Sequence, residues 1–203
     1  LRTPEQFCAR AKEVYEFYEK HARRRFKWLR SGLFISELHN DLKSDADSLL
    51  KILKSAGQWE AAADTKLQTL VDTLNKAHPD DKVLIFTQFA DTARYLENQL
   101  SAMGVDRISS ATGDSGDPTQ LAWRFSPVSN EKRDLISPEQ ELRVLVATDV
   151  LSEGQNLQDC HLVVNYDLPW AIIRLIQRAG RVDRIGQEAD TILCYSFLTA
   201  EGV

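Results

Sequence analysis

Cysteine is scarce in this sequence, and long apolar runs are missing. The three cysteines, Cys8, Cys160 and Cys194, lie far apart along the chain, which fits neither a disulfide framework nor a zinc site. We therefore expect a reducing, intracellular environment and no bound metal. No apolar run reaches the roughly 18 residues that a membrane-spanning helix requires. We also expect no signal peptide, and hence no association with a membrane.

The sequence also lacks an excess of positive charge and a phosphate-binding loop of its own. A net charge of −5 argues against a protein coated with nucleic acid, although it does not exclude a local basic groove. No glycine is followed by lysine, and no Asp-Glu pair follows a strand-like run. Without these two motifs the chain cannot hold a nucleoside triphosphate and its magnesium ion as a P-loop enzyme does. We expect the chain to be a piece of a longer polypeptide.

What the sequence does contain is an arginine-rich stretch between Asp167 and Gln187. We expect a helix that starts near Trp170 and ends at about Ile185, with an Ile-rich apolar side. The spacing of three of its arginines predicts one shared helical face, with a fourth one turn later; these are Arg174, Arg178, Arg181 and Arg184. Clustered guanidinium groups repel one another unless an anion lies opposite, and their fork matches two phosphate oxygens at once. The pattern therefore favours a phosphate site over a solvated basic face.

From residue 61 onward, short apolar runs alternate with helical patterns. The expected strands are 83–86, 107–111, 142–147, 162–166 and 191–198, and the expected helices between them include 65–77, 92–103 and 119–125. Two of the strands, Val-Leu-Ile-Phe and Val-Leu-Val-Ala, are apolar without alternation, as in a parallel sheet that is covered on both faces. Residues 61–203 are therefore predicted to form an open α/β domain with a parallel sheet flanked by helices.

Residues 1–60 are predicted to form a helical segment ahead of that domain. A capping box with proline at the first helical position starts at Thr3, and this helix is expected to continue to about Trp28. A second helical region is expected over 33–56, with an interruption near 40–44. Its buried side is expected to carry Leu49, Leu50, Ile52 and Leu53. We expect this segment to be more loosely attached than the α/β domain.

Three of the predicted strands end in threonine, at the edge of the sheet where ligands bind in open parallel sheets. These ends are Thr87-Gln88, Thr112-Gly113 and Thr148-Asp149. A row of hydroxyls and backbone N–H groups suits a sugar–phosphate backbone. Any single threonine is better explained by its preference for strands and turns, but three beside an arginine helix favour a nucleic-acid-binding rim. Trp170 is expected either near this rim as an exposed indole or in the core beneath the arginine helix.

Several of these stretches together resemble superfamily-two helicases. Residues 147–149 with 153–158 look like motif V, 177–187 looks like motif VI, and 83–89 looks like motif IV. The ending Asp-Arg-Ile-Gly-Gln is similar to SWI/SNF-type translocases, and the Ser-Glu-Gly form of motif V is similar to their bacterial branch, which includes an RNA polymerase-associated ATPase. The resemblance covers about 64–198, while the family's Trp-Asn-Pro is replaced by Trp170-Ala171-Ile172.

This resemblance implies the C-terminal, RecA-like lobe of a two-lobed motor, with residues 1–60 as a helical connector or insertion. The full-length protein would use ATP and Mg²⁺ in the cleft between the lobes, and its partners would be the N-terminal RecA-like lobe and DNA, with double-stranded DNA favoured. The isolated chain is expected to be inactive, monomeric and without a tightly bound cofactor. The resemblance also implies a cytoplasmic, nucleoid-associated bacterial protein or another intracellular one.

The resemblance also assigns roles to individual residues. It makes Arg181 and Arg184 the arginine fingers that face the γ-phosphate, and it places Gly154, Asn156 and Gln177 at the nucleotide. Arg178 is expected to be structural. The alternative for the two fingers is a structural role in salt bridges to Asp149, Glu153 or Asp183. The alternatives for the whole chain are a lobe of an RNA helicase and a non-enzymatic nucleic-acid-binding module.

Overall fold

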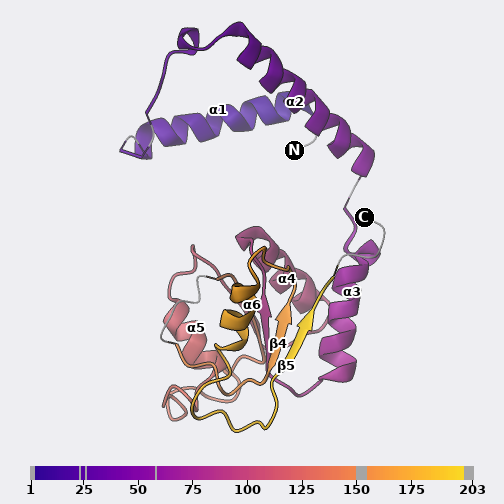
Figure 1. Cartoon of the computed structure of the whole chain (residues 1–203), viewed down its shortest axis with the longest axis vertical. Coiled ribbons are helices and arrows are strands. Elements are labelled where there is room, and N and C mark those ends of the chain that lie inside the picture. Colours follow the sequence, from indigo (N-terminus) through magenta and orange to yellow (C-terminus); the bar gives the residue numbers. More distant parts are fainter. Residues whose placement is uncertain (1–2, 23, 26, 58, 150–154, 199–203) are drawn as a thin grey trace. The chain divides into compact units, whose positions relative to one another are not determined.

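The computed structural model describes residues 3–22, 24–25, 27–57, 59–149 and 155–198. The chain divides into two compact units, residues 1–60 and 61–203, which are shown in Figure 1. The first unit contains helix α1 (Pro4–His21), a 3₁₀ turn η1 (Ser31–Leu33) and helix α2 (Ser36–Ala56). The predicted capping box is present, because Thr3 Oγ1 accepts from the Gln6 N–H and Gln6 Oε1 accepts from the Thr3 N–H.

Three details of the first unit differ from the sequence-based expectation. Helix α1 ends at His21 rather than near Trp28, and α2 is continuous, because its middle contains neither proline nor glycine to interrupt it. The expected buried side of α2 is not buried: Leu49 is 66% exposed and Ile52 is 63% exposed. An apolar helical side is buried only where another element covers it, and no described residue of α1 or α2 is buried.

The second unit is an α/β domain with an all-parallel sheet of five strands in the order β2-β3-β1-β4-β5. The strands are β1 (Val83–Phe86), β2 (Ile108–Ala111), β3 (Val144–Ala147), β4 (Leu162–Asn165) and β5 (Leu193–Ser196). All five lie within the predicted apolar runs, although four of them are shorter than expected. The predicted fold class is therefore confirmed.

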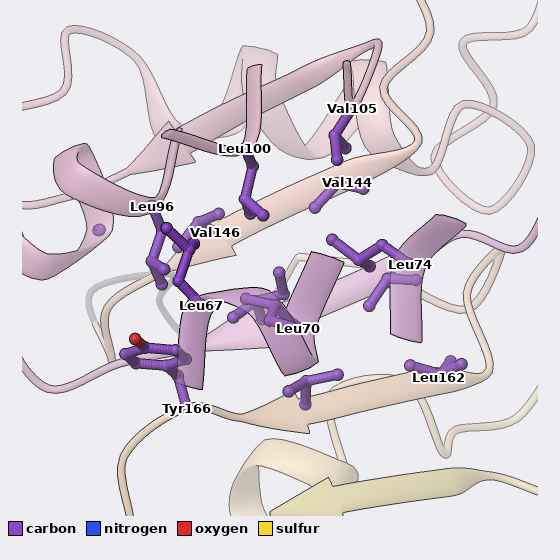
Figure 2. Packing of buried hydrophobic residues seen from close by; sticks show 14 residues of the cluster. Leu67, Leu70, Leu74, Leu96, Leu100, Val105, Val144, Val146, Leu162 and Tyr166 are labelled. Carbon is purple, nitrogen blue, oxygen red and sulfur yellow. The ribbon is translucent and has the colours of Figure 1, made fainter. Parts of the chain in front are cut away.

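Both faces of the sheet are covered, which explains the absence of alternation in the β1 sequence. Val83 and Ile85 belong to one core cluster, whereas Leu84 and Phe86 belong to the other. The first cluster is formed with α3 (Thr65–Asp72), the π-helical turn η3 (Thr73–Ala77) and α4 (Ala90–Ala102), and Figure 2 shows its packing. The second cluster includes Phe125 from α5 (Pro118–Phe125), and α5 lies on the opposite side of the sheet from α3 (Figure 1).

Helix starts in this unit follow the capping residues in the sequence. The Asp64 carboxylate accepts from the Leu67 N–H at 3.0 Å, as predicted for the start of α3. Asp117 caps α5 in the same way, through the N–H groups of Thr119 and Gln120. Among the described residues, no helix is long and apolar enough to cross a membrane.

The arginine helix is shorter than expected. Helix α6 spans Ile172–Ala179, so it contains Arg178 but neither Arg181 nor Arg184. Glycine at position 180 is unfavourable in a helix interior by about 1 kcal/mol relative to alanine. Two residues later, Val182 is fully buried in the second core cluster. Arg174 and Arg178 do share one face of α6 and both contact Asp149, but the chain turns to bury Val182, so Arg181 does not join the expected common face.

Candidate functional site

The three strand-end threonines lie at one edge of the sheet but are turned inward. Thr87, Thr112 and Thr148 follow β1, β2 and β3, whose parallel pairing places their carboxyl ends together. Their exposed fractions are only 0%, 2% and 4%. The Thr112 hydroxyl lies 3.3 Å from the Ser115 hydroxyl, and the Thr148 hydroxyl donates to the Ala111 carbonyl at 3.5 Å. The three threonines therefore share the expected edge, but each hydroxyl already has a partner within the protein.

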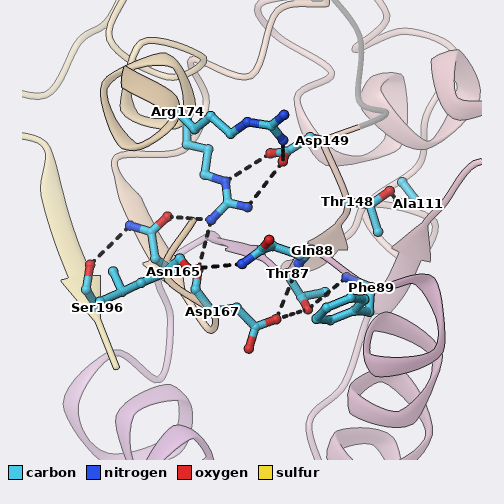
Figure 3. Close-up of polar contacts among 12 residues, drawn as sticks. Thr87, Gln88, Phe89, Ala111, Thr148, Asp149, Asn165, Asp167, Arg174 and Ser196 are labelled. Atoms are coloured by element: carbon cyan, nitrogen blue, oxygen red, sulfur yellow. Dashed lines mark hydrogen bonds and ion pairs between the residues drawn. The ribbon is translucent and has the colours of Figure 1, made fainter. Parts of the chain in front are cut away.

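Thr87 belongs to a polar network centred on Asp167, which follows β4 (Figure 3). The Thr87 hydroxyl and the Gln88 N–H both donate to Asp167 Oδ2, the second at 3.3 Å. The Gln88 side chain donates to the Leu168 carbonyl at 2.9 Å, and Lys66 Nζ lies 3.5 Å from Asp167 Oδ1. These contacts join the end of β1 to the segment after β4 and to α3.

Arg178 forms the buried part of this network. Its Nε lies 3.0 Å from Asp149 Oδ1, and its Nη1 donates to Asn165 Oδ1 at 3.2 Å and to the Asp167 carbonyl at 3.1 Å. The guanidinium also lies over the Phe86 ring, 5.1 Å from its centroid. Arg178 is 2% exposed and is fully engaged within the protein, as a structural residue would be.

Asp149 lies between two guanidinium groups, because Arg174 Nη1 approaches its Oδ2 at 3.0 Å (Figure 3). Burial of the Asp149 carboxyl by itself would raise its pKa. The hydrogen bonds and charges of Arg178 and Arg174 together outweigh that effect, so the pKa of Asp149 is lowered. The carboxylate is therefore ionised at neutral pH and holds α6 against the end of β3.

Arg181 and Arg184 lie beyond α6 in the turn 180–187. Arg184 Nε donates to the Gly180 carbonyl at 3.2 Å, and its Nη1 donates to the Gln155 carbonyl at 3.4 Å. Within the described ranges, neither arginine forms an ion pair with a carboxylate. An open hollow of about 630 Å³ lies beside Arg184 and is lined by Asn156, Gln158, Asp183, Arg184 and Ile185. Among the described residues, no carboxylate is paired with Arg184 where an anion would approach it, and Glu153, one of the alternative partners, lies outside those residues.

The other predicted site residues have different surroundings. Gly154 lies outside the described residues. Asn156 lines the hollow, and its side chain donates to the Ser129 carbonyl at 3.0 Å. Gln177 and Gly113 are exposed. Trp170 is 102% exposed, which excludes the alternative of a core residue beneath α6.

Sequence reasoning gave no separate role to four residues that organise the site. Asp167 and Asn165 close the network at the end of β4, Lys66 joins it from α3, and Gln187 binds the turn that carries Arg184. A carboxylate or amide directly after an apolar strand is a usable signal, because the carboxyl ends of parallel strands meet at one edge. Lys66 and Gln187 have no such signal. Among the described residues, no cluster of His, Cys, Asp and Glu could hold a metal ion.

Comparison with known proteins identifies the family. The helicase conserved C-terminal domain matches residues 65–186, which include the whole network around Asp167 and the turn with Arg184. The chain belongs to this family. This helicase C-terminal domain is of the superfamily-two type, as the order of motifs in the sequence predicts.

Two bacterial relatives are similar to this helicase C-terminal domain. An uncharacterised ATP-dependent helicase, YqhH of Bacillus subtilis (strain 168), is 33% identical over 148 residues, which are 72% of this chain and 23% of that protein. The RNA polymerase-associated protein RapA of Vibrio cholerae serotype O1 (strain M66-2) is 30% identical over 138 residues, which are 67% of this chain and 13% of that protein. The chain thus spans less than a quarter of the length of either protein.

Similarity extends to RNA helicases and to a solved ATPase structure. The DEAD-box ATP-dependent RNA helicase 35A of Oryza sativa subsp. japonica is 32% identical over 61% of this chain and 18% of its own length. The structure of the C-terminal part of the Fun30 ATPase domain matches with a TM-score of 0.55 and 18% identity, covering 77% of this chain and 48% of that one. The Fun30 match supports the fold of this helicase C-terminal domain.

Proposed function

We propose that this domain is the second motor lobe of an ATP-dependent DNA translocase or helicase, and that Arg181 and Arg184 act on ATP bound between two lobes. The observation that carries the proposal is the position of Arg184. It lies beside an open hollow, without a carboxylate partner among the described residues, in a chain that has no P-loop. The N-terminal lobe of the same polypeptide would supply the P-loop and the residues that hold Mg²⁺.

The chemistry of the hollow fits the terminal phosphate of ATP. As the γ-phosphoryl group transfers, negative charge spreads over its oxygens, and a guanidinium placed there stabilises the transition state more than the ground state. An arginine finger contributes roughly 10³- to 10⁵-fold in rate, or about 4–7 kcal/mol. Among the described residues, Arg184 donates to two backbone carbonyls, those of Gly180 and Gln155, which it can exchange for phosphate oxygens. Asn156 and Gln177, with Gly154, would contact the rest of the nucleotide.

The nucleic-acid track is proposed to follow the edge of the sheet where β1, β2 and β3 end. Gln88 and Gly113 are exposed there, and Trp170 offers a fully exposed indole to sugars or bases. Thr87, Thr112 and Thr148 contribute by holding the backbone of this edge, since their hydroxyls are engaged within the protein. Contacts of this kind carry little sequence information.

DNA is favoured over RNA by the Ile-Gly-Gln ending of the arginine segment and by the exposed Trp170. The second candidate, an RNA helicase lobe, is supported by the similarity to the rice DEAD-box protein. The third, a non-enzymatic nucleic-acid-binding module, would use the arginines only to hold phosphate.

In all three candidates, residues 1–60 are proposed to be a helical connector or insertion. We further propose a monomeric, cytoplasmic or nucleoid-associated protein.

The test uses the complete two-lobed polypeptide and the substitution Arg184→Lys. Lysine keeps the charge but loses the planar fork, so we expect ATP turnover to fall by about 10³-fold while ATP affinity changes little. The matched control is Arg94→Lys, which changes an exposed arginine paired with Asp91 and Asp114. Equal turnover in the wild type and Arg184→Lys would show that the finger lies elsewhere.

Assays of the complete polypeptide with different nucleic acids also distinguish the candidate functions. Stimulation of turnover by duplex DNA but not by duplex RNA supports the DNA motor, and the reverse supports an RNA helicase. Triplex displacement without strand separation would identify a translocase. Absence of any ATP turnover by the complete polypeptide would leave the non-enzymatic module.

A further inference from the structure

The turn 180–187, which carries Arg181 and Arg184, is held by the side chain of one residue at its end. Gln187 Nε2 donates to the Val182 carbonyl at 2.9 Å, inside the turn, and to the Cys160 carbonyl at 2.9 Å, outside it. Gln187 Oε1 accepts from the Ala189 N–H at 2.9 Å. Both amide hydrogens and the amide oxygen of Gln187 are therefore engaged.

The Cys160 carbonyl is a fixed point of the domain. Cys160 is 0% exposed and lies two residues before Leu162, the first residue of β4. Its Sγ lies 3.1 Å from the Lys82 carbonyl oxygen and 3.2 Å from the Leu162 carbonyl oxygen, either of which can accept its one hydrogen. By binding this carbonyl, Gln187 fastens the turn to the amino-terminal end of the central strands.

Two further side chains join the turn to residues 155–158, through longer hydrogen bonds than the one from Gln187 to Cys160. Gln158 Nε2 donates to the Ile185 carbonyl at 3.1 Å, while its buried Oε1 has no hydrogen-bond partner in the part of the chain that the structure describes. Arg184 Nη1 donates to the Gln155 carbonyl at 3.4 Å, which is long for such a bond. Gln187 differs because its one amide bridges the turn and the core. Its backbone N–H also donates to the Arg184 carbonyl at 3.0 Å.

We infer that Gln187 is a positioning residue for the arginine finger Arg184, an inference that rests on the proposed function. Removal of its two donated hydrogen bonds releases the turn from Cys160 and so shifts Arg184, whose own side chain is chemically unchanged. Glutamine is suited to this role, because asparagine is one methylene shorter and glutamate would set a carboxylate against two carbonyl oxygens. A misplacement of about 1 Å at a catalytic group can reduce a rate about 10²-fold.

The experiment measures steady-state ATP turnover of the complete two-lobed polypeptide with saturating nucleic acid. Gln187→Met keeps the length of the side chain but removes its hydrogen bonds, and Gln187→Glu keeps the shape but removes the donors. The control is Gln120→Met, at an exposed position on α5. We expect kcat to fall roughly 10- to 100-fold in both Gln187 variants, while the KM for ATP stays within about twofold.

The decisive comparison combines Gln187→Met with Arg184→Ala. If Gln187 acts through Arg184, the double variant loses no more activity than Arg184→Ala alone, because the group to be positioned is already absent. Circular dichroism and Tm of each variant show whether the fold is retained. A general structural defect would instead lower activity further in the double variant.

The possible results separate this inference from the function on which it rests. Normal kcat in Gln187→Met, together with collapse in Arg184→Ala, overturns the inference and leaves the proposed function intact. Independent, additive losses also overturn it. Normal turnover in Arg184→Ala overturns both, since no arginine finger is then present at residue 184.

Discussion

Arg178 and Asp149 form an ion pair between α6 and the end of β3 that is buried on the arginine side, with Arg178 Nε 3.0 Å from Asp149 Oδ1. The Arg178 side chain is 2% exposed, whereas that of Asp149 is 34% exposed and also meets Arg174. Arg178 additionally donates to Asn165 and to the Asp167 carbonyl, so one guanidinium connects the end of β3 to the end of β4. Arg178 therefore differs from Arg184 in its contacts, although the two lie six residues apart in one motif.

Loss of the Asp149 carboxylate should destabilise the α/β unit. Asp149→Asn leaves the buried Arg178 guanidinium without its counter-charge, and because Asp149 is itself 34% exposed we expect a cost of about 1–3 kcal/mol. Urea unfolding of the chain should show this decrease. The control Arg174→Gln removes the partner that is 55% exposed and should cost less than about 1 kcal/mol. Similar losses in the two variants would contradict the structural role of the buried pair.

Stability of the α/β unit should fall at acidic pH. Burial would raise the pKa of Asp149 and of Glu141, but nearby cations outweigh it and lower both: Arg178 and Arg174 at Asp149, and Arg133 and Lys82 at Glu141. A lowered pKa in the folded state gives stability that is complete above the unfolded pKa, about 4, and is lost as the pH falls through the folded value.

The measurement is the free energy of unfolding in urea between pH 7 and pH 3. We expect Asp149 and Glu141 to change the free energy of unfolding little between pH 7 and about pH 5. Below about pH 4 the free energy of unfolding should decline steeply. Asp149→Asn and Glu141→Gln should each make that decline shallower. An unchanged acid slope in both variants would show that other carboxylates control it.

The three cysteines should differ sharply in reactivity. Burial raises the pKa of the Cys160 thiol to about 12, while Cys8 and Cys194 are exposed. In the native chain at pH 8, a thiol reagent should therefore modify Cys8 and Cys194 but not Cys160, because the thiolate is the reacting form. Mass spectrometry of the labelled chain gives the result. Labelling of Cys160 should appear only as the chain unfolds in urea.

Truncation of one core leucine should be far more costly than truncation of an exposed one. Leu70 is 0% exposed in the cluster that joins α3 to the sheet, so Leu70→Ala should reduce the free energy of unfolding by about 2–5 kcal/mol. Leu135 in the same unit is 70% exposed, and Leu135→Ala should change it by less than about 0.5 kcal/mol. Chemical unfolding of both variants tests this difference.

Trp170 should matter for nucleic acid and not for stability. Because its side chain is 102% exposed, Trp170→Ala should leave the free energy of unfolding within about 0.5 kcal/mol of the wild type. Loss of one stacking contact of about 1–3 kcal/mol should weaken nucleic-acid binding by the complete polypeptide about tenfold. Fluorescence anisotropy at fixed salt measures the affinity, with Trp59→Ala as the control. An unchanged affinity would remove Trp170 from the proposed track.

Sequence patterns predicted the fold because the information that they carry is local. Apolar runs such as 83–86 identify strands covered on both faces, and a side-chain oxygen at Thr3 or Asp64 starts a helix within three residues. The same approach misplaced the end of α6, since that end depends on the burial of Val182 in a core formed by distant strands. It also predicted a buried side for α2, because an apolar pattern does not say whether a partner is present.

The sequence by itself determined the fold class and the family of this protein, since strand runs, capping residues and motif order are all short-range features of the chain. Only the tertiary structure decided which polar groups are engaged. The Thr87 hydroxyl donates to Asp167, 80 residues away, and Arg178 binds Asp149, 29 residues away, whereas Arg184 donates to the backbone carbonyls of Gly180 and Gln155. Such pairings depend on which segments the sheet order brings together, and a hydrogen bond across 80 residues has no signature in the local spacing of side chains.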